Sequence, residues 1–553
     1  MKKLLFVLAL LLGGLHTLSA ERYHVKVDGD DWLDGRSWKE AFATLQKAID
    51  QAQLGDEIWV AAGIYTPTQS AMDDYDGDTG RSNTFLLKEG VNLYGGFPAA
   101  GNPGMAQRDW EAHPSILSGN IGHPDEVSDN VYHVVMAVSL IAKTLMDGFI
   151  ICDGRADNNE LTVTVRGISL RHGYGGGLFS HKSSLVLQNI LFQHNYAVYG
   201  GGMLNDQSES VLYRVTFRGN NSEKQGGGLT NLKSAPTLKE VGFYANTSDW
   251  GGGLYIGDDA NPRLEQIVFD SNTANSGGGG IYNSTNACPT IKTVTFSGNK
   301  AGQSGGGLFN ADGASPVLHE VFFFENEASW GGGILNFSTA SPVLHRVSIR
   351  GNTATRYGGG ISNQKGAQPV LCNVLISGNN APEGGGIYNT EATPLLFHVT
   401  LAGNYAESGS AMLNNEAAPE LYNCLIVDNH SGVLNKASIP LYSHCMVQGM
   451  TAIQVNNSGG EGNISSTSAE AVFVQPAGPA SKASVRGDYH LAPSSPAIGS
   501  GSFAFWDTPM SRLEGKSLIN FLAERDLSAL DLDGKVREAG ATDLGTYVGE
   551  ATK

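Results

Sequence analysis

Three aspartates stand at alternate positions in the segment DDYDGDTG. Asp74, Asp76 and Asp78 resemble the alternating carboxylates that supply oxygen ligands in calcium-binding loops. The segment lacks the later bidentate glutamate and the glycine placement of such loops. A solvated acidic loop is therefore the favoured interpretation, with a calcium site as the alternative, and the sequence indicates no other cofactor.

A pair of carboxylates would indicate glycoside hydrolysis, which needs two of them roughly 5–10 Å apart. Glu240 and Glu265 belong to neighbouring copies of the repeat described below, but their positions in it differ by one residue, which predicts opposite faces of a strand. Glu320 has the position of Glu240 three copies later, roughly 14 Å away. Neither pair meets the requirement, so we interpret all three as solvated strand residues.

Four aromatic residues stand directly before a run of three glycines: Tyr199, Trp250, Trp330 and Tyr357. Other copies of this position hold the polar residues Gln225, Ser304 and Glu383, which predicts an exposed site. Trp and Tyr rings beside glycines can stack on the faces of sugars. Trp330 and Tyr357 lie in adjacent copies and would form one platform for a glycan. The more conservative interpretation is that these rings pack over the backbone of a corner.

Three further motifs have both a structural and a functional interpretation. Asp258 and Asp259 in YIGDDANP interrupt the repeat, and we expect a loop insertion, with a functional site as the alternative. His319 and His345 share one position in the repeat, so we expect rings stacked on neighbouring turns as surface residues rather than metal ligands. The segment GQSGG at Gly302 has the spacing of a nucleophile elbow but lacks the strand-to-helix turn that such an elbow requires.

The elements that position these residues repeat along the chain. Eight steps of about 26 residues separate the last glycine of the triplet at Gly177 from that at Gly386. An asparagine follows three positions after most triplets, with Ile256 as an exception, and a second asparagine precedes each triplet by five or six residues. Apolar residues two apart, as at Val347 and Ile349, give each copy one apolar face.

One copy cannot bury its apolar face alone, and stacking of identical copies buries the faces in a continuous column. A unit with about three short strands and no helical pattern is one turn of a parallel β-helix, whose turns pair at roughly 4.8 Å. The glycines suit the tight bend of a corner. The asparagines tolerate the left-handed backbone of corners and can hydrogen-bond to the copies above and below. We therefore predict an all-β solenoid.

The flanking segments are predicted to close the ends of the solenoid. The segment SWKEAFATLQKAIDQAQLG is expected to be an α-helix with Ser37 and Glu40 as its capping box, and it would cover the edge of the first turn. The C-terminal tail would cover the other end. We divide the chain into a signal peptide at 1–20, a cap helix with irregular early coils at 21–160, regular repeats at 161–450, and late coils with a capping segment at 451–553.

The N-terminal sequence and the composition indicate where the protein is located and which partners it has. Lys2, Lys3 and the apolar run Leu4–Leu12 precede small residues near Ala20, which is the pattern of a secretory signal peptide. No later apolar run is long enough for a transmembrane helix. The net charge of −18 disfavours nucleic acid as a partner. Five cysteines, an odd and low number, argue against a disulfide framework, so we expect a soluble exported protein with buried thiols.

The repeats GGG[IL]xN and GN resemble the polymorphic outer-membrane protein repeat, with VTFSGN and GGGLFN in place of its strand end and turn. The whole chain is similar to exported right-handed parallel β-helix proteins of Gram-negative bacteria, which have a pectate-lyase-like fold. The opening GRSWKEAFATLQKAIDQAQLGDEIWVAAGIYTPT and the closing DLDGKVREAGATDLGTY carry this likeness. The resemblance implies a right-handed coil and an extracellular or outer-membrane location. It is specific for fold and not for activity.

Two hypotheses on function follow. The first is a non-catalytic, adhesin-like or glycan-binding protein outside the cell, whose partner is an extracellular glycan or a host or cell surface. The second is a polysaccharide lyase or glycoside hydrolase with its site on irregular loops, at Asp74–Asp78 or at Asp258–Asp259. Because the regular repeat shows no paired catalytic groups, we favour the first and expect no turnover of polysaccharide.

Overall fold

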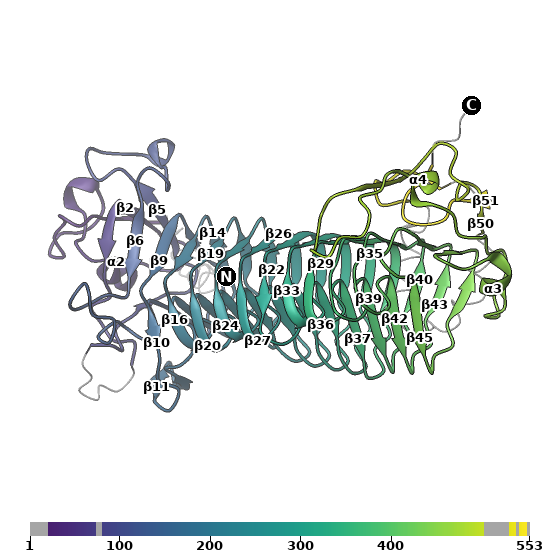
Figure 1. The fold of residues 1–553 in the computed structure, drawn as a ribbon. Helices are drawn as coiled ribbons and strands as arrows, with labels where there is room; N and C mark the ends of the chain where they lie inside the picture. The colour runs from purple at the N-terminus through teal and green to yellow at the C-terminus, as the bar shows by residue number, and fades with distance from the viewer. Residues whose placement is uncertain (1–19, 73–79, 503–529, 538–540, 550–553) are drawn as a thin grey trace, which may run out of the picture.

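The computed structural model describes residues 20–72, 80–502, 530–537 and 541–549, most of which form an elongated rod of stacked β-strands (Figure 1). Three parallel sheets of 24, 13 and 8 strands run along the rod, and we call them sheets 1, 2 and 3. About 26 residues complete one turn. The parallel β-helix and its repeat length are confirmed, whereas residues 1–19 of the predicted signal peptide lie outside the described range.

The strands have these bounds. Sheet 1 contains β1 (Arg22–Val25), β2 (Glu57–Ala61), β3 (Gly63–Tyr65), β5 (Asn92–Phe97), β6 (Ser115–Ser118), β8 (Thr144–Asp147), β9 (Phe149–Cys152), β14 (Leu185–Gln188), β15 (Leu191–Gln193), β18 (Val211–Tyr213), β19 (Thr216–Arg218), β22 (Thr237–Lys239), β23 (Gly242–Tyr244), β26 (Arg263–Asp270), β29 (Thr290–Ser297), β32 (Val317–Phe324), β35 (Val343–Arg350), β38 (Val370–Ser377), β40 (Leu395–Phe397), β41 (Thr400–Ala402), β43 (Glu420–Tyr422), β44 (Leu425–Ile426), β46 (Leu441–Ser443) and β47 (Met446–Val447). Sheet 2 contains β4 (Phe85–Leu86), β7 (Val135–Val138), β13 (Leu178–His181), β17 (Met203–Asp206), β21 (Leu229–Leu232), β25 (Leu254–Ile256), β28 (Ile281–Asn283), β31 (Leu308–Asn310), β34 (Ile334–Asn336), β37 (Ile361–Gln364), β39 (Ile387–Thr390), β42 (Met412–Asn415) and β45 (Val433–Lys436). Sheet 3 contains β10 (Arg155–Ala156), β16 (Tyr196–Tyr199), β20 (Asn221–Gln225), β24 (Thr247–Trp250), β27 (Thr273–Gly277), β30 (Lys300–Ala301), β33 (Glu327–Trp330) and β36 (Thr353–Tyr357).

Few elements lie outside the coil. Three antiparallel pairs join β11 (Thr162–Val165) to β12 (Ile168–Arg171), β48 (Phe473–Gln475) to β49 (Asp488–Leu491), and β50 (Gly501–Ser502) to β51 (Ala541–Thr542). The helices are α2 (Leu45–Gln51), α3 (Ala452–Asn456) and α4 (Ala469–Val472), with the 3₁₀ turns η1 (Trp38–Glu40) and η2 (Met105–Gln107). No helix in the described part of the chain is long and apolar enough to cross a membrane.

The N-terminal cap is shorter than the predicted helix, which is split into η1 and α2. Ser37 caps η1 as predicted, since its hydroxyl accepts the Glu40 amide hydrogen at 3.2 Å. The interruption is explained by Asp31, whose carboxylate accepts the amide hydrogens of Ala43 and Thr44 at 2.9 and 3.0 Å. These two bonds hold an extended chain directly before α2, so a single continuous helix is excluded.

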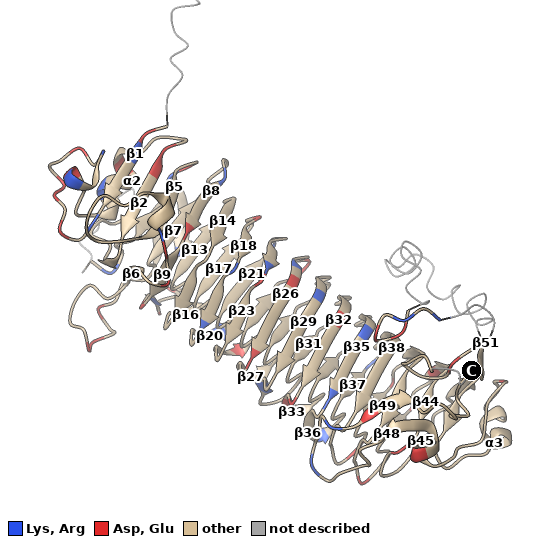
Figure 2. Ribbon diagram, turned by 90° about the horizontal axis from the view of Figure 1, so that it is seen from above, with Lys and Arg blue, Asp and Glu red and all other residues tan. Residues whose placement is uncertain are grey.

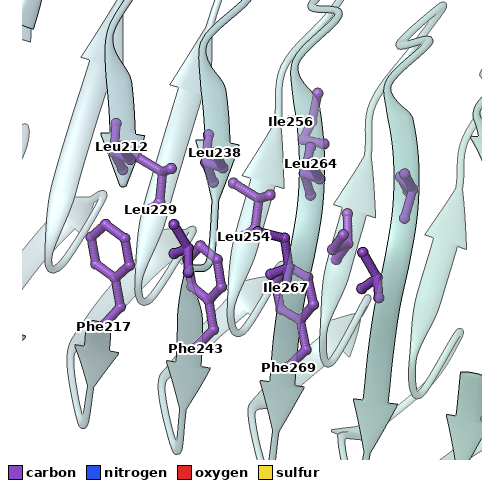
Figure 3. Close-up of a cluster of buried hydrophobic side chains, with 14 of the residues drawn as sticks. Leu212, Phe217, Leu229, Leu238, Phe243, Leu254, Ile256, Leu264, Ile267 and Phe269 are labelled. Atoms are coloured by element: carbon purple, nitrogen blue, oxygen red, sulfur yellow. The ribbon is translucent and has the colours of Figure 1, made fainter. Parts of the chain in front are cut away.

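Stacked phenylalanine rings form the axis of the core (Figure 3). One ring per turn is contributed by Phe192, Phe217, Phe243, Phe269, Phe296 and Phe323. Consecutive ring centroids lie 4.6 to 4.9 Å apart in nearly parallel planes, and the rings are fully buried. Burial of each ring contributes roughly 1.5–3 kcal/mol, so stacking of turns is the main source of stability.

The glycine triplet is a structural corner, as Gly331–Gly333 illustrates. Gly331 has a φ of +62°, which residues with a side chain rarely adopt. A Cβ on Gly332 would lie 2.6 Å from the carbonyl oxygen of Gly359 in the next turn. A Cβ on Gly333 would lie 2.7 Å from the carbonyl oxygen of Gly360 in the next turn and 3.1 Å from the Ile349 side chain inside the coil. The backbone conformation thus disfavours a side chain at Gly331, and the close approach of the next turn excludes one at Gly332 and Gly333.

Two ladders of buried asparagines connect the turns, as predicted. Ladder 1 consists of Asn195, Asn220, Asn246, Asn272, Asn299, Asn326, Asn352, Asn379, Asn404 and Asn429. Ladder 2 consists of Asn205 and Asn231 and, after a gap, of Asn283, Asn310, Asn336, Asn363, Asn389, Asn414 and Asn435. In both, each side-chain amide donates to the oxygen of the next asparagine at 2.7 to 3.1 Å.

Ile256 fills the gap in ladder 2 and leaves a polar atom unpaired. The Oδ1 atom of Asn283 is buried and has no hydrogen-bond partner among the described residues. In every later turn of the ladder the asparagine Oδ1 atom accepts a hydrogen bond from the side-chain amide of the asparagine one turn earlier. The apolar side chain of Ile256 has no hydrogen-bond donor. Burial of the Asn283 Oδ1 atom therefore costs free energy that no hydrogen bond offsets.

Replacing Ile256 by asparagine is expected to change the free energy of unfolding by less than about 1 kcal/mol, because restored ladder hydrogen bonds offset the lost apolar burial. The matched control is Ile281→Asn, which buries an amide without a ladder partner and should cost about 3 kcal/mol or more. Urea denaturation of both variants measures the difference. Equal losses in the two would contradict the role assigned to the unpaired oxygen.

A left-handed residue bends every turn of sheet 1. Glu240 has a φ of +54° and lies with Lys239 between the buried Leu238 and Val241. Two consecutive side chains therefore point outward, and the simple alternation of a strand is lost. Glu265 pairs in register with Lys239, so it shares this outer face. The prediction that Glu240 and Glu265 lie on opposite faces is wrong because the bend was not visible in the sequence.

The C-terminal residues cover more than the end of the rod. Val455 of α3 joins the interior core at that end, as expected for a cap. From α4 onward the chain returns along the outer face of sheet 1 (Figure 1), and we call residues 469–502, 530–537 and 541–549 the C-terminal strap. The strap buries apolar side chains against Leu375, Leu425 and Met446 of the late turns.

His490 connects two parts of the strap through hydrogen bonds. The Nδ1 and Nε2 atoms of His490 lie 2.5 Å from Asp488 and 2.7 Å from Asp533, and the ring packs 4.0 Å from that of Tyr547. Burial lowers the pKa of His490, but the hydrogen bonds to Asp533 and Asp488 outweigh it and the net pKa is raised. Arg350, the cation that faces this group, helps to lower the pKa of Asp488.

The strap is expected to loosen as the pH rises through the raised pKa of His490. Protonated His490 bridges two carboxylates, so its contribution is complete below the ordinary histidine pKa of about 6.5 and is lost above the folded-state pKa. Hydrogen exchange of residues 473–502, corrected for intrinsic rates, should show protection that falls as the pH rises above the ordinary histidine pKa of about 6.5. His490→Gln should remove the pH dependence of this protection. A pH dependence that persists in the variant would contradict the role assigned to the His490 bridge.

Candidate functional site

An aromatic strip lies on the outward-facing side of the coil where sheet 3 turns into sheet 2, and the rings of Tyr255, Phe309 and Tyr388 in it are buried. It consists of Trp250, Tyr255, Tyr282, Phe309, Trp330, Tyr357 and Tyr388. Three of these residues end strands β24, β33 and β36, directly before the glycine corner, and the other four lie in the middle of sheet 2 strands. Because the chain bends sharply at this corner, aromatic rings at the ends of sheet 3 strands lie against rings of sheet 2 strands.

One half of the aromatic strip is the platform predicted from the sequence. The ring centroids of Trp330 and Tyr357 lie 4.4 Å apart, and those of Tyr357 and Tyr388 lie 4.6 Å apart. Trp330 and Tyr357 are half-buried, so each ring both packs on the protein and remains partly accessible. The predicted adjacency is confirmed, while binding of a glycan there stays a prediction.

The other half of the strip is centred on Trp250. Its ring lies 5.0 Å from that of Tyr282 and 6.2 Å from that of Phe309. Gly277 holds the same position in the next turn, where a Cβ would lie 3.1 Å from the Trp250 ring. Trp330 packs against the buried cluster of Phe309, Ala311 and Leu335, against which Tyr282 of this half also packs. From Tyr255 to Tyr388 there are five turn-to-turn steps, so the strip is about 24 Å long.

Tyr199 is not part of the aromatic strip. Its ring lies 5.2 Å from that of Tyr174, in a separate apolar cluster that also contains Val163 and Leu170 of the β11–β12 hairpin. Gln225 takes the same position in the turn between Tyr199 and Trp250. Of the four predicted residues, the structure brings Trp250, Trp330 and Tyr357 into one surface and places Tyr199 elsewhere.

The acidic motifs do not form a metal site in the described part of the chain. Asp74, Asp76 and Asp78 lie outside the described residues, so the calcium prediction is untested. Asp258 and Asp259 belong to a turn of ordinary length, because Ile256–Pro262 and Asn283–Pro289 span the same number of residues. The predicted loop insertion is therefore wrong. Among the described residues no three His, Cys, Asp or Glu side chains are placed to share a metal ion.

The candidate acid and base residues have structural partners. Glu240 accepts from Arg214 at 2.9 Å, and Glu320 accepts from Arg346 at 2.6 Å. Each carboxylate is thus held by the arginine of a neighbouring turn rather than facing a second carboxylate. This arrangement does not supply the carboxylate pair of a glycosidase.

The two histidines stack as predicted but are not surface residues. The rings of His319 and His345 lie 5.1 Å apart in nearly parallel planes. Their exposed fractions are only 9% and 0%. His345 pairs in register with Cys372, which belongs to a buried apolar cluster on the outer side of sheet 1. The expected exposure is wrong because this face of the late turns is covered.

A cavity of about 520 Å³ opens on the outer face of sheet 1, near the N-terminal end. Its lining includes Trp110, Glu111, Asn189, Arg214, Thr216 and Arg218. We call it the Trp110 cavity. Its volume is in the range of small-molecule sites, and the rest of its lining consists of Pro114, Gly148, Phe149, Ile150, Ile190 and Leu191.

The loop that carries Trp110 is fixed to the rod. Arg108 forms a buried ion pair with Asp147, with nitrogen–oxygen distances of 2.8 and 3.0 Å. Asp147 also accepts a hydrogen bond at 2.7 Å from Asn189, which lines the cavity. Gly148 allows the close approach, since a Cβ there would lie 3.1 Å from the Trp110 side chain. The cavity is therefore preformed rather than dependent on a mobile loop.

Comparison with known proteins identifies the fold and little else. Residues 229–405 match the family described as right handed beta helix region. No curated protein matches the sequence. Similar solved structures include the pectate lyase Pel9A (11% identity, 97% of this chain and 98% of that chain, TM-score 0.30) and a rhamnogalacturonan lyase (12%, 73% and 82%, 0.18). A Yersinia enterocolitica family 28 exopolygalacturonase shares 13% identity over 76% of each chain, with a TM-score of 0.20. Likeness at this level carries no information on activity.

The stacked parallel sheets define the fold of the described residues as a parallel β-helix, and residues 229–405 of it match the right-handed β-helix family model. The predicted fold class is confirmed. The resemblance of its repeats to the polymorphic outer-membrane protein repeat stays a prediction, as do export and surface location.

Proposed function

We propose that this protein is a non-catalytic glycan-binding β-helix protein that acts outside the cell and uses the aromatic strip as its binding surface. The observation that supports this most directly is the close spacing of neighbouring rings in each half of the strip. The centroids lie 4.8 to 5.3 Å apart in the half around Trp250 and 4.4 to 4.6 Å apart from Trp330 to Tyr388. Trp and Tyr rings have an apolar face and a polar edge, which suits the apolar face of a sugar and its surrounding hydroxyl groups. A strip parallel to the rod fits an extended chain of sugars better than a single one.

Binding rather than cleavage is favoured by the placement of the acidic groups. Glu240 and Glu320 are each neutralised by an arginine. The carboxylates near the strip are Asp258, beside Tyr255, and Glu383, beside Tyr388, at opposite ends of it. Hydrolysis would require a pair of carboxylates beside the bound sugar. We therefore propose an adhesin-like or scaffold role, with an extracellular glycan or a cell surface as partner.

The paired change Trp330→Ser with Tyr357→Gln is expected to reduce glycan-array signal by about tenfold or more, because stacking of two rings is lost. Both replacements are residue types close to those found at this position in other turns, so the coil should tolerate them. The matched control is Tyr199→Gln, which changes the same position outside the strip and should leave binding intact. Loss of stability without loss of binding would show that these rings only pack the corner.

A further inference from the structure

We propose that the Trp110 cavity is a second binding site, which holds a saccharide that carries an anionic group, either a carboxylate or a sulfate. The cavity opens on sheet 1, whereas the aromatic strip lies at the corner between sheets 3 and 2. The inference rests on the proposed function only in taking a saccharide as the ligand. Its residues are separate from those of the strip.

The cavity offers a stacking face for a sugar ring. Trp110 forms one wall, and Ile150 and Leu191 provide an aliphatic floor. An indole opposite an aliphatic surface suits a flat ring with one apolar face, and the indole N–H and the hydroxyl group of Thr216 suit its polar edge. Asn189 adds an amide that Asp147 holds in place at 2.7 Å. The site therefore combines a rigid wall with an oriented polar group.

One arginine of the lining is available to an anion. Arg214 and Arg218 line the cavity together with the carboxylate of Glu111, and Arg214 is already paired with Glu240. Glu240 holds Arg214 from the next turn at 2.9 Å and so fixes its direction. No carboxylate among the described residues lies within ion-pair distance of Arg218, whose guanidinium instead lies 5.8 Å from the centre of the Tyr244 ring. Arg218 is thus available to an anionic ligand.

The guanidinium of Arg218 stands out against the charge of the rest of the protein. The chain has a net charge of −18, and basic and acidic segments are interspersed along the rod (Figure 2). A single available arginine on such a background would attract anions only at close range, where a guanidinium fork matches carboxylate or sulfate oxygens. The geometry thus favours recognition of one anionic group over general attraction to a polyanion.

Titration calorimetry of the full chain can test the site with three probes. Dextran sulfate and alginate oligosaccharides carry sulfate and carboxylate groups, and neutral dextran is the uncharged control. We expect one of the charged probes to bind and neutral dextran to bind at least tenfold more weakly. Arg218→Gln should weaken the charged probe about tenfold or more, since one charge-assisted hydrogen bond is removed. Arg263→Gln, an exposed arginine of sheet 1 outside the cavity, should have no effect.

Two further variants separate the two sites. Trp110→Ala should abolish binding of the charged probe, whereas Trp330→Ser with Tyr357→Gln should leave it unchanged. The inference is overturned if neither charged probe binds, or if Arg263→Gln weakens binding as much as Arg218→Gln. It is also overturned if the strip variant abolishes binding and Trp110→Ala does not, a result that would support the strip instead. Binding that depends on Trp110 while strip variants bind every glycan normally would support the cavity and contradict the proposed role of the strip.

Discussion

Gly332→Ala is expected to destabilise the protein by about 3–5 kcal/mol, an unusually large effect for the addition of one methyl group. The new Cβ would lie 2.5 Å from the carbonyl oxygen of Thr353 and 2.6 Å from that of Gly359. Both contacts are with backbone, so no side chain can rotate away. Relief requires two stacked turns to separate, which weakens the hydrogen bonds between them. Urea denaturation followed by circular dichroism measures the loss.

The control for Gly332→Ala is Gly366→Ala. Gly366 has a φ of +87°, but nothing lies within 4 Å of the position where a Cβ would stand. Only backbone strain of about 1–2 kcal/mol is expected there. If both variants lost the same stability, strain rather than close stacking would explain the triplets.

Asn326→Ala is expected to cost about 3–4 kcal/mol. The Nδ2 of Asn326 donates to the Phe296 carbonyl oxygen at 3.0 Å and to Asn352 Oδ1 at 2.9 Å, and its Oδ1 accepts both the backbone amide and the side-chain amide of Asn299 at 3.0 Å. Alanine would leave two donors of Asn299 and one carbonyl oxygen buried without partners, at about 1–3 kcal/mol each before relaxation.

The matched control for the ladder is Asn275→Ala. Asn275 is exposed and makes one side-chain hydrogen bond, to Asp249 at 2.8 Å. Its removal should cost less than about 0.5 kcal/mol because water replaces the lost partner. Thermal unfolding of both variants gives the comparison. A cost for Asn326→Ala as small as that of the control would mean that water reaches the interior of the ladder.

The regular part of the fold is visible in the sequence because each turn obeys the same packing rule. Phe323 and Ile349 occupy equal positions in the stack, and Asn326 and Asn352 occupy equal positions in the ladder, so spacing alone identifies them. The bends of sheet 1 are different. Residues as unlike as Glu320, with φ of +56°, and Arg346, with φ of +54°, adopt the same conformation, so no residue type marks it.

The surfaces depend on contacts that a repeat does not encode. Trp110 lies outside the repeats and meets Arg214 and Arg218 only in the folded chain, so the cavity was not predicted. The strap corresponds to one signal in the sequence. β38 has apolar residues at six of its eight positions and is buried at all eight, as expected for a strand covered on both faces. β26, where exposed or half-buried residues separate the buried ones, is an uncovered strand.

The C-terminal strap also has a kinetic consequence. Its hydrogen bonds reach from Leu532 to Arg346 and from Thr546 to Thr400, so the turns that carry these partners must be stacked before it can dock. Docking is therefore expected late in folding, after growth of the coil has passed those turns. Once docked, the strap joins turns that would otherwise be linked only through their neighbours, and it opposes fraying of the solenoid from its C-terminal end.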